Sequence, residues 1–403
     1  MHRMAMTRAV EVAVVGGGPA GLTAAIALAA AGVETALIAK RPPADNRTTA
    51  LLSGSVAALD ALGVWALCRT QSAPLTAIRL IDATPRLLRA PEVLFEAAEI
   101  GLEAFGHNIE NRHLIAALDQ RAATLPQLQR IETTVTAVEP DDASVTLRLD
   151  DGGTIEARLV VGADGRKSLC RAAAGIEMER HSYPQAALTL NLTHARPHRG
   201  ISTEFHTQSG PFTLVPLPGL RSSLVCVVEP EEAERLAALD ADALSAEVER
   251  RGHSILGKVR VEPGHGLFPL GVETARSFAG SRIALIGEAA HVIPPIGAQG
   301  LNLGLRDAAT IGELVVEARR DGADVGGHEV LSQYDKRRRA DVTTRALAVD
   351  ALNRSLLSDF LPVQGARGLG IFLLDRIAPL RRAVMREGVE AAAQPRLMRG
   401  EAL

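Results

Sequence analysis

The sequence predicts an α/β protein with a Rossmann-like domain, an inserted α+β domain and a C-terminal helical region. Three observations lead to this fold class. A glycine-rich turn joins an apolar strand to an apolar helix near the start of the chain, two later strands run into short glycine motifs, and strands alternate between residues 183 and 271. At roughly 150 residues per domain, 403 residues are enough for two or three folding units.

The first forty residues predict a βαβ unit. Val10–Val15 is a β-branched run, Leu22–Ala31 is a strong helix former stopped by Gly32, and Thr35–Ala39 is a second strand. Two strands joined through a helix imply a parallel sheet.

The rest of the chain divides by its pattern into further helices and strands. We expect helices at Asn111–Thr124, Glu231–Arg251 and Leu301–Arg320, and strands at Thr133–Val138, Ser144–Leu149, Arg158–Val161 and Arg282–Ile286. Hairpins are expected at Asp151-Gly152-Gly153 and at Pro218-Gly219, the latter joining Phe212–Leu217 to Ser222–Val228. The predicted domains are 8–75, 107–182 and 272–345 for the Rossmann-like part, 76–106 and 183–271 for the inserted part, and 346–403 for the helical end.

Composition excludes several classes of protein. Hydrophobic residues make up 47% of the chain, which argues against disorder, and a net charge of −3 offers no field for nucleic acid. Cys68, Cys170 and Cys226 are scattered, so we expect neither a disulfide framework nor a metal site, and we expect a cytoplasmic protein. The sequence contains no run of about 18 uncharged apolar residues, so we expect no membrane-spanning helix.

The turn Gly16-x-Gly18-x-x-Gly21 has the strand–turn–helix context of a dinucleotide site. Its glycines allow the turn and let a pyrophosphate approach the backbone, while Pro19 and Ala20 open the helix whose N–H groups face that anion. The next strand ends at Lys40, where a Rossmann fold normally has an acid that binds the ribose hydroxyls. Lys40 in this place leaves an NADP-dependent dehydrogenase open as an alternative, and Lys40 could also be simply a solvated residue at the strand end.

Two distant motifs decide between these alternatives. Val161–Arg166 reads VGADGR, with Ser168 and Arg171 after it, and residues 286–304 read IGEAAHVIPPIGAQGLNLG. With the first turn, these motifs resemble the flavoprotein aromatic hydroxylases of the para-hydroxybenzoate hydroxylase type. The stretch through Asp307, together with 45–51, 62–65 and 106–112, is similar to the ubiquinone-biosynthesis hydroxylases within that group. The resemblance runs from residue 10 to about 345.

The resemblance implies a Rossmann-like FAD-binding domain and a set of FAD contacts. Glu288 would bind the ribitol hydroxyls in place of the family's usual Asp, and the helix from about Leu301 would direct its positive end at the flavin pyrimidine. Arg47 and Arg112 match FAD-contacting positions, although a surface salt bridge is the alternative for each. The expected cofactor-binding residues are Gly16, Gly18, Pro19, Ala20, Gly21, Lys40, Arg47, Arg112, Val135, Asp164, Gly287, Glu288, Pro295, Gly297, Gln299, Gly300, Leu301 and Asn302.

By the same resemblance, the expected reaction is hydroxylation of the ring of a polyprenylated phenol through a flavin hydroperoxide. The reductant would be NADH or NADPH, or a protein electron donor. The alternatives are hydroxylation of another aromatic compound, a prenyl-chain reductase, and a prenyl-binding protein without FAD. We interpret His291 as a structural residue, and no catalytic acid or base is predicted.

Two apolar regions complete the expectations. The strands of 183–271 could line a hydrophobic ligand or could simply pack as core; their apolar residues are Phe205, Phe212, Leu214, Val215, Leu217, Leu224, Val225 and Val227. Toward the end of the chain, an apolar face next to Arg381, Arg382 and Arg386 could rest on the inner face of a membrane or on a partner protein, and could also pack internally. That face comprises Leu356, Leu357, Phe360, Leu361 and Ile371–Leu374.

Overall fold

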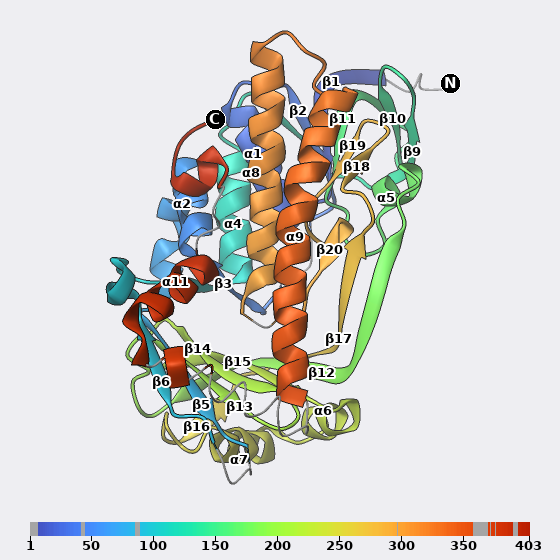
Figure 1. Cartoon of the computed structure of the whole chain (residues 1–403). Helices are drawn as coiled ribbons and strands as arrows, with labels where there is room; N and C mark the ends of the chain where they lie inside the picture. Colours follow the sequence, from blue (N-terminus) through green and yellow to red (C-terminus); the bar gives the residue numbers. More distant parts are fainter. Residues whose placement is uncertain are drawn as a thin grey trace.

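A computed structural model describes residues 7–41, 45–84, 89–295, 297–357, 370, 372–374, 376–389 and 394–403. Within these residues the strands form one eight-stranded, one nine-stranded and one three-stranded sheet. Figure 1 shows the first sheet and its helices in the upper half of the molecule and the second sheet in the lower half.

The eight-stranded sheet is built around the predicted βαβ unit, which is confirmed. β1 pairs in parallel with β2 on one side and with β11 on the other, and α1 connects β1 to β2. The predicted hairpin between β10 and β11 is also present. The strands of this sheet are β1 (Thr7–Val15), β2 (Thr35–Ile38), β8 (Leu128–Ile131), β9 (Val135–Pro140), β10 (Val145–Leu149), β11 (Thr154–Gly162), β18 (Ala279–Gly280) and β19 (Ile283–Leu285).

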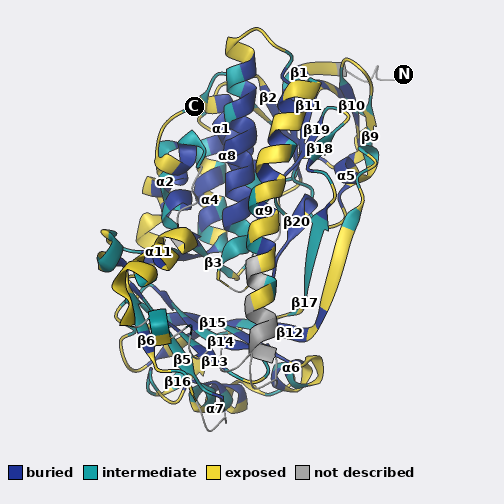
Figure 2. Cartoon of the chain, in the orientation of Figure 1, coloured by how far each residue is buried: buried dark blue, intermediate teal, exposed yellow. Residues whose placement is uncertain are grey.

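Helices cover this sheet and enclose the main core. α1 (Pro19–Ala30) is apolar on all sides because it lies between the sheet, α4 (Asn111–Ala122) and the 22-residue α8 (Gln299–Arg320). Figure 2 shows α1, α4 and α8 as largely buried, whereas α9 (His328–Leu357) exposes one side. The shorter elements nearby are α2 (Ser53–Ala61), α3 (Trp65–Cys68), α5 (Leu169–Ala173) and the three-stranded sheet of β3 (Thr48–Leu52), β4 (Ser72–Pro74) and β7 (Gly106–Glu110).

The nine-stranded sheet contains the predicted hairpin of β14 and β15, which is confirmed. Helices α6 (Pro230–Ala237) and α7 (Ala241–Arg251) pack on one of its faces. The prediction of one helix over Glu231–Arg251 is wrong, because Asp240 accepts a hydrogen bond from the Ala243 N–H at 2.8 Å and starts a second helix there. The strands are β5 (Ala77–Asp82), β6 (Val93–Glu96), β12 (Met178–His194), β13 (Ile201–His206), β14 (Pro211–Leu217), β15 (Arg221–Val228), β16 (Val259–Val261), β17 (Gly266–Ala275) and β20 (His291–Val292).

The predicted domain division is retained as a proposal. Residues 76–106 and 183–271 contribute β5, β6 and β13–β16 to the nine-stranded sheet, but β12 begins before residue 183 and β17 continues past 271. The two long strands therefore belong to both parts, as the extended ribbon of β12 shows in Figure 1.

The C-terminal part continues with α11 (Ala378–Val389) and a short 3₁₀ turn at Arg396–Arg399. Phe360, Leu361 and Ile371, and the side chains of Leu356 and Leu357, lie outside the described residues.

Candidate cofactor and substrate site

The three glycines of the first turn have different surroundings. Gly16 has φ +118°, and a Cβ there would lie 2.2 Å from the Ala163 carbonyl oxygen; a Cβ on Gly21 would lie 2.1 Å from the Gly16 oxygen. At Gly18 a Cβ would meet nothing within 4 Å. Gly16 and Gly21 are therefore required by packing, whereas the space above Gly18 is available to a ligand.

The helix that follows this turn begins with backbone N–H groups that have no partner within the helix. Gly18 is the N-cap of α1 and offers no side-chain acceptor, Pro19 occupies the first turn, and that turn contains no acidic residue. The free N–H groups and the helix dipole fit a pyrophosphate. The Ala20 Cβ lies next to two further glycines: a Cβ added to Gly287 would be 3.4 Å from it, and one added to Gly304 would be 3.2 Å from it. The glycine turn, the Gly287 loop and α8 therefore converge.

Asp164 organises the loop that follows β11. Its carboxylate accepts hydrogen bonds from the Ser168 hydroxyl at 2.6 Å and from the Leu169 N–H at 2.7 Å. Arg171, which was not among the predicted site residues, is buried and donates to the Ala289 oxygen at 2.9 Å. Arg171 thus ties the Asp164 loop to the Gly287 loop, so that two of the three predicted motifs are held together.

Glu288 is exposed at the rim of this site. Arg166 lies 3.6 Å from its carboxylate. The pKa of the Arg47 guanidinium is raised, mainly by its hydrogen bonds to Asp45 and to a smaller extent by the negative charge of Glu288. Arg47 pairs with Asp45 at 2.8 Å and lies 5.5 Å from the Phe268 ring centroid. Glu288 and Arg166 therefore lie exposed beside the Gly287 loop, whereas the Arg47 guanidinium is engaged with Asp45.

Asp307 is the centre of a buried charge network that the sequence did not reveal. Its fully buried carboxylate accepts from the Gly287 N–H at 2.9 Å, from His291 Nε2 at 2.7 Å and from Arg338 Nε at 2.6 Å. Burial disfavours the charged form, but Arg338 and His291 outweigh it and hold the pKa of Asp307 below its ordinary value. His291 is thereby bonded within the protein, in agreement with its interpretation as structural.

The network continues along α9 to the start of α8. Arg338 and Arg306 both pair with Asp341, and Arg345 bridges Asp341 and the Gln299 side-chain oxygen, the latter at 3.2 Å. Burial raises the pKa of Asp341, but the neighbouring arginines lower it more strongly, so the group stays charged. Gln299, the first residue of α8, is thus fixed from α9.

The N-terminus of α8 is also uncapped. Ala298 has φ +56°, offers no side-chain acceptor, and no acid lies in the first turn. The Asn302 side chain is engaged with the protein: its oxygen accepts from the Leu52 N–H at 2.9 Å and from the Ser55 hydroxyl at 2.7 Å, and its amide donates to the Ala50 oxygen. A cofactor would meet the backbone N–H groups of this turn, because the Asn302 side chain faces β3 and α2.

The remaining predicted residues lie at different depths. Val135 is buried at the start of β9, and Lys40 is exposed and pairs with Asp150 at 3.3 Å. Arg112 is half-exposed and pairs with Glu110 at 2.9 Å, and Gly297 has φ +68°. Gly300 and Leu301 lie in the first turn of α8, and Pro295 precedes that helix by four residues.

The predicted substrate wall divides between the two faces of the nine-stranded sheet. Some of its residues pack under α6 and α7 as core: Phe205, Phe212, Leu214 and Leu224. Val225 and Val227 belong to a separate cluster with Tyr183, Ala187 and Leu270 on the opposite face, because alternate residues of a strand point to opposite sides. A ligand wall is therefore restricted to this second, smaller cluster.

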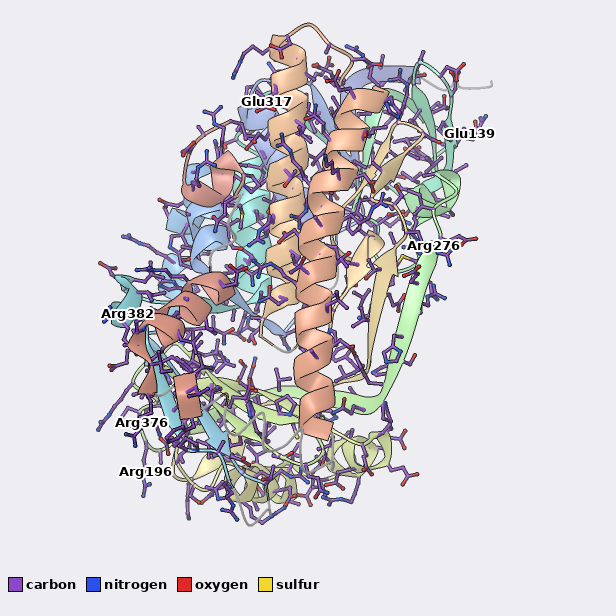
Figure 3. The ribbon with its side chains drawn as sticks, viewed as in Figure 1. Glu139, Arg196, Arg276, Glu317, Arg376 and Arg382 are labelled. Atoms are coloured by element: carbon purple, nitrogen blue, oxygen red, sulfur yellow. The ribbon has the colours of Figure 1, made fainter. Side chains whose placement is uncertain are left out.

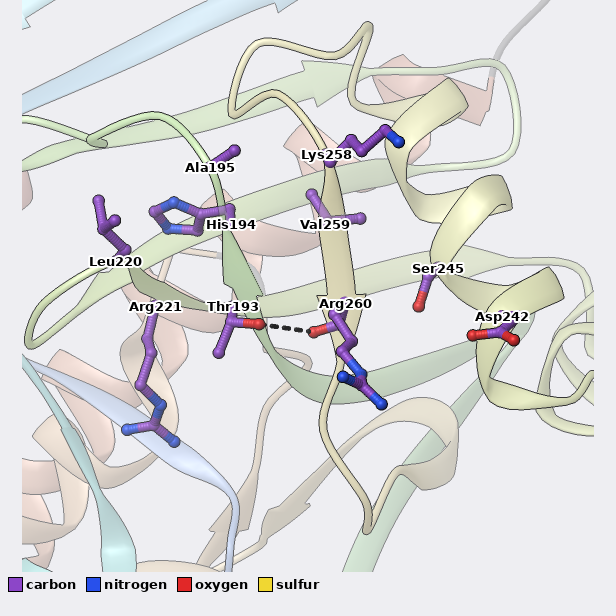
Figure 4. Close-up of a pocket in the computed structure, with 10 residues that line it drawn as sticks. All are labelled: Thr193, His194, Ala195, Leu220, Arg221, Asp242, Ser245, Lys258, Val259 and Arg260. Carbon is purple, nitrogen blue, oxygen red and sulfur yellow. Dashed lines mark hydrogen bonds between the residues drawn. The ribbon is translucent and has the colours of Figure 1, made fainter.

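An open hollow of about 860 Å³ lies elsewhere on this sheet, at the edge formed by β16 and α7 (Figure 4). It is lined by Arg221, Lys258 and Arg260 among others, and Arg221 is already paired with Glu110 and Glu262. It contains no residue of the glycine turn or of the Asp164 and Gly287 loops, so it is separate from the cofactor site.

The parallel sheet and the convergence of three glycine-containing loops on one place define a protein that binds a dinucleotide cofactor. The family model described as "FAD binding domain" matches residues 9–348. Ubiquinone hydroxylase UbiL of Rhodospirillum rubrum is 38% identical over 402 residues, covering 97% of this chain and 92% of that protein, and 3-demethoxyubiquinol 3-hydroxylase of Escherichia coli is 31% identical, covering 93% and 97%. Among solved structures, p-nitrophenol 4-monooxygenase PnpA of Pseudomonas putida superimposes with a TM-score of 0.78 at 19% identity, covering 96% of this chain and 100% of that one, which supports the fold. The chain belongs to the FAD-binding-domain family and, within it, to the ubiquinone-biosynthesis hydroxylases, which are FAD-dependent monooxygenases.

Proposed function

We propose that this enzyme hydroxylates the aromatic ring of a polyprenylated phenol in ubiquinone biosynthesis, with O2 as oxidant and NADH or NADPH as reductant. The observation that carries the proposal is that a cofactor-binding geometry and an apolar surface occur in the same molecule. Two uncapped helix N-termini, of α1 and α8, meet at the glycine loops, and the nine-stranded sheet offers an apolar cluster on the face opposite α6 and α7. Names of the relatives, which include a ubiquinone hydroxylase and a demethoxyubiquinol hydroxylase, supply the substrate class.

The residues divide the work of binding FAD. The N–H groups at the start of α1 would hold the pyrophosphate above Gly18, and Glu288 would accept hydrogen bonds from the ribitol hydroxyls. The N–H groups at the start of α8 would face the pyrimidine edge of the ring and stabilise negative charge there. When bound, FAD supplies the reduction of O2 and the transfer of one oxygen atom to the ring.

The experiment is hydroxylation of a prenylated phenol under ¹⁸O2. We expect the purified yellow protein, given NADH or NADPH and 2-farnesylphenol, to form a product that contains one labelled oxygen atom in the ring. Consumption of the reductant with a saturated prenyl chain and no label would instead indicate a prenyl-chain reductase. In the organism that carries the gene, deletion should cause accumulation of a quinone precursor that lacks one ring hydroxyl.

We further propose that α11 and the residues just before it rest on an anionic membrane surface. Ile377, Leu380 and Val384 are 42 to 46% exposed and recur at helical spacing, and Arg382 and Arg386 are exposed beside them. In Figure 3, Arg376 and Arg382 lie on the same side of the molecule as Arg196 of the nine-stranded sheet region, so basic groups extend beyond the helix. Among the described residues, no helix is long and apolar enough to cross a bilayer, so contact would be peripheral.

Vesicle flotation tests this contact. We expect the chain to float with phosphatidylglycerol vesicles, and a variant with Ile377, Leu380 and Val384 replaced by Ser to remain at the bottom. The control replaces Leu67 and Leu220, which are 42% and 48% exposed on other elements, by Ser and should still float. Equal flotation of all three proteins would exclude α11 as the membrane contact, and flotation only in the presence of other cell proteins would indicate a protein partner.

A further inference from the structure

A second hollow, of about 340 Å³, lies on the face of the nine-stranded sheet that carries α6 and α7. Its floor contains residues in register on neighbouring strands: Arg79 of β5 is opposite Thr203 of β13, and Thr203 is opposite Leu214 of β14. The loop after β12 and the loop after α7 form its walls, with His198 and Leu256. None of the described residues that line it belongs to the glycine turn or to the loops that converge on that turn, so the hollow is separate from the cofactor site.

The wall after β12 is a tight turn with a fixed conformation. Arg199 and Gly200 both have positive φ, +54° and +72°, and the Ile201 N–H closes the turn by donating to the His198 carbonyl at 3.0 Å. The His198 ring accepts from the Gly200 N–H through Nδ1 at 3.0 Å, so its Nε2 must donate to the Leu217 carbonyl, which lies 2.9 Å away. His198 is therefore a neutral part of the wall, and the charge of the hollow comes from its arginines.

Two of these arginines have no acidic partner. Arg196 and Arg199 are exposed, and neither forms an ion pair with another residue that the structure describes. The Arg196 guanidinium donates to the Ser254 carbonyl at a long distance of 3.4 Å. Arg79, by contrast, is half-buried and pairs with Glu92 at 3.3 Å. The rim of the hollow therefore has two uncompensated positive charges.

Thr203 adds a buried hydroxyl without a partner. The residue is 4% exposed and lines the hollow, and its hydroxyl makes no hydrogen bond to any part of the chain that the structure describes. A buried hydroxyl in this state is unfavourable unless a ligand or water satisfies it. Leu214 and Leu256, also buried, supply an apolar surface in the same hollow. A ligand that fits therefore combines an anionic group with an apolar portion.

We propose that this hollow binds a phosphate group attached to an apolar chain. Arg196 and Arg199 contact the phosphate oxygens, Thr203 donates its hydroxyl to the same group, and the chain lies on Leu214 and Leu256. Arginine forks match the geometry of phosphate, and a phosphate monoester has a charge of about −1.5 to −2 at neutral pH, which balances the two arginines. This site is additional to the proposed hydroxylation and does not depend on it.

Two sources carry this chemistry, a phospholipid head group and a soluble organic phosphate. The hollow lies near the sheet edge on which α11 packs, because Arg381 of α11 donates to the Leu94 carbonyl of β6 and β6 pairs with β5, the strand of Arg79. Figure 3 shows Arg196 on the same side of the molecule as Arg376. If α11 contacts a membrane, the hollow is close to that membrane, so a lipid is the source that its position favours.

The test measures binding of hexyl phosphate to the FAD-loaded full chain by isothermal titration calorimetry. We expect hexyl phosphate to bind at least about tenfold more tightly than inorganic phosphate, because burial of two CH₂ groups is sufficient for that difference. The double variant Arg196→Gln/Arg199→Gln should weaken binding at least ~100-fold, since it removes two charge-assisted hydrogen bonds. Thr203→Val should weaken binding roughly 3- to 10-fold with an unchanged or higher melting temperature, and it carries the test if the double variant does not fold.

The matched control is Lys258→Gln/Arg260→Gln. It removes the same charge from two exposed residues of the other hollow on this sheet, shown in Figure 4, and should bind hexyl phosphate like the wild type. Flotation with phosphatidylcholine vesicles that contain phosphatidic acid identifies the source. Loss of flotation in Arg196→Gln/Arg199→Gln alone indicates a lipid head group, and unchanged flotation with loss of hexyl phosphate binding indicates a soluble organic phosphate.

Three results would overturn the proposal. They are a wild type that does not bind hexyl phosphate, equal affinity for hexyl phosphate and inorganic phosphate, and equal loss of binding in the two double variants. The last result would mean that the affinity comes from the overall charge of the domain. These readouts involve no reductant or phenol, so they leave the proposed hydroxylation untouched whichever way they fall.

Discussion

The different surroundings of Gly16 and Gly18 lead to a prediction that separates folding from cofactor binding. In Gly16→Ala the new methyl group would lie 2.2 Å from the Ala163 oxygen, and the residue would have to keep φ at +118°. The strained backbone costs about 1–2 kcal/mol and the overlap about 1–3 kcal/mol more. We therefore expect Gly16→Ala to lower the free energy of unfolding by roughly 2–5 kcal/mol, even in the absence of FAD.

Gly18→Ala should behave in the opposite way. Gly18 has φ −72°, and the new methyl group would meet no protein atom within 4 Å, so the apoprotein should be about as stable as the wild type. The unfolded chain loses entropy worth about 0.4–1 kcal/mol, and this gain offsets the poorer preference of Ala for the N-cap position. The methyl group would occupy the space where a pyrophosphate approaches the helix N-terminus. The loss of one charge-assisted hydrogen bond, about 1.5–3 kcal/mol, weakens FAD binding by roughly 10- to 150-fold.

The assay is thermal unfolding of the flavin-free proteins, followed by titration with FAD and measurement of the quenching of its fluorescence. Gly21→Ala, whose methyl group would lie 2.1 Å from the Gly16 oxygen, is the control and should resemble Gly16→Ala. The reasoning is refuted if Gly18→Ala unfolds as early as Gly16→Ala, or if it binds FAD as tightly as the wild type.

Three further predictions follow from the site. Glu288→Gln should weaken FAD binding about tenfold with an unchanged apoprotein melting temperature, because an exposed ion pair such as Arg166–Glu288 contributes about 0–1 kcal/mol; an unchanged FAD affinity would remove Glu288 from the site. Asp307→Asn should destabilise the protein by about 3–5 kcal/mol in denaturant titration, since Arg338 loses its buried partner, and a loss below 1 kcal/mol would contradict the network. The pKa values of Asp307 and Asp341 are lowered in the folded protein, so their stabilisation is present above the unfolded pKa of about 4 and is lost as pH falls further. The melting temperature should therefore be level between about pH 5 and 8, fall below about pH 4, and fall less steeply in Asp341→Asn.

Local patterns were sufficient to predict the cofactor half of the molecule. The strand at Val10–Val15, the glycine turn and the following helix are specified by residues next to one another, and the structure confirms them. The three motifs could be assigned to one site by resemblance, and their convergence through Ala20, Gly287 and Gly304 agrees with that assignment. The break at Asp240 had a readable signal, since Asp is a preferred N-cap, but the continuous amphipathic pattern concealed it.

The long-range contacts could not be read from local patterns. Asp307 was part of a quoted motif, yet its role depends on Arg338, which reaches it only because α9 packs on α8. The Asn302 side chain faces Leu52 and Ser55, and no spacing rule relates residues about 250 positions apart. The shift in the pairing of β12 with β17 between Ser182 and Ala186 is likewise a property of two paired strands, and the sequence of one strand does not show it.

One helix bonds both the cofactor loops and the substrate face, and this limits how the two can move relative to each other. The upper contacts of α9 are buried and ionic, through Arg338 and Asp341, so breaking them would leave uncompensated charge in the core. Lower on α9, Asp350 accepts a hydrogen bond from the Tyr183 hydroxyl at 2.6 Å, next to the apolar cluster of Ala187, Val227 and Leu270. α9 therefore connects the Gly287 loop to the apolar face of the nine-stranded sheet, and a shift of α9 that separated Arg338 from Asp307 would leave a buried charge unpaired.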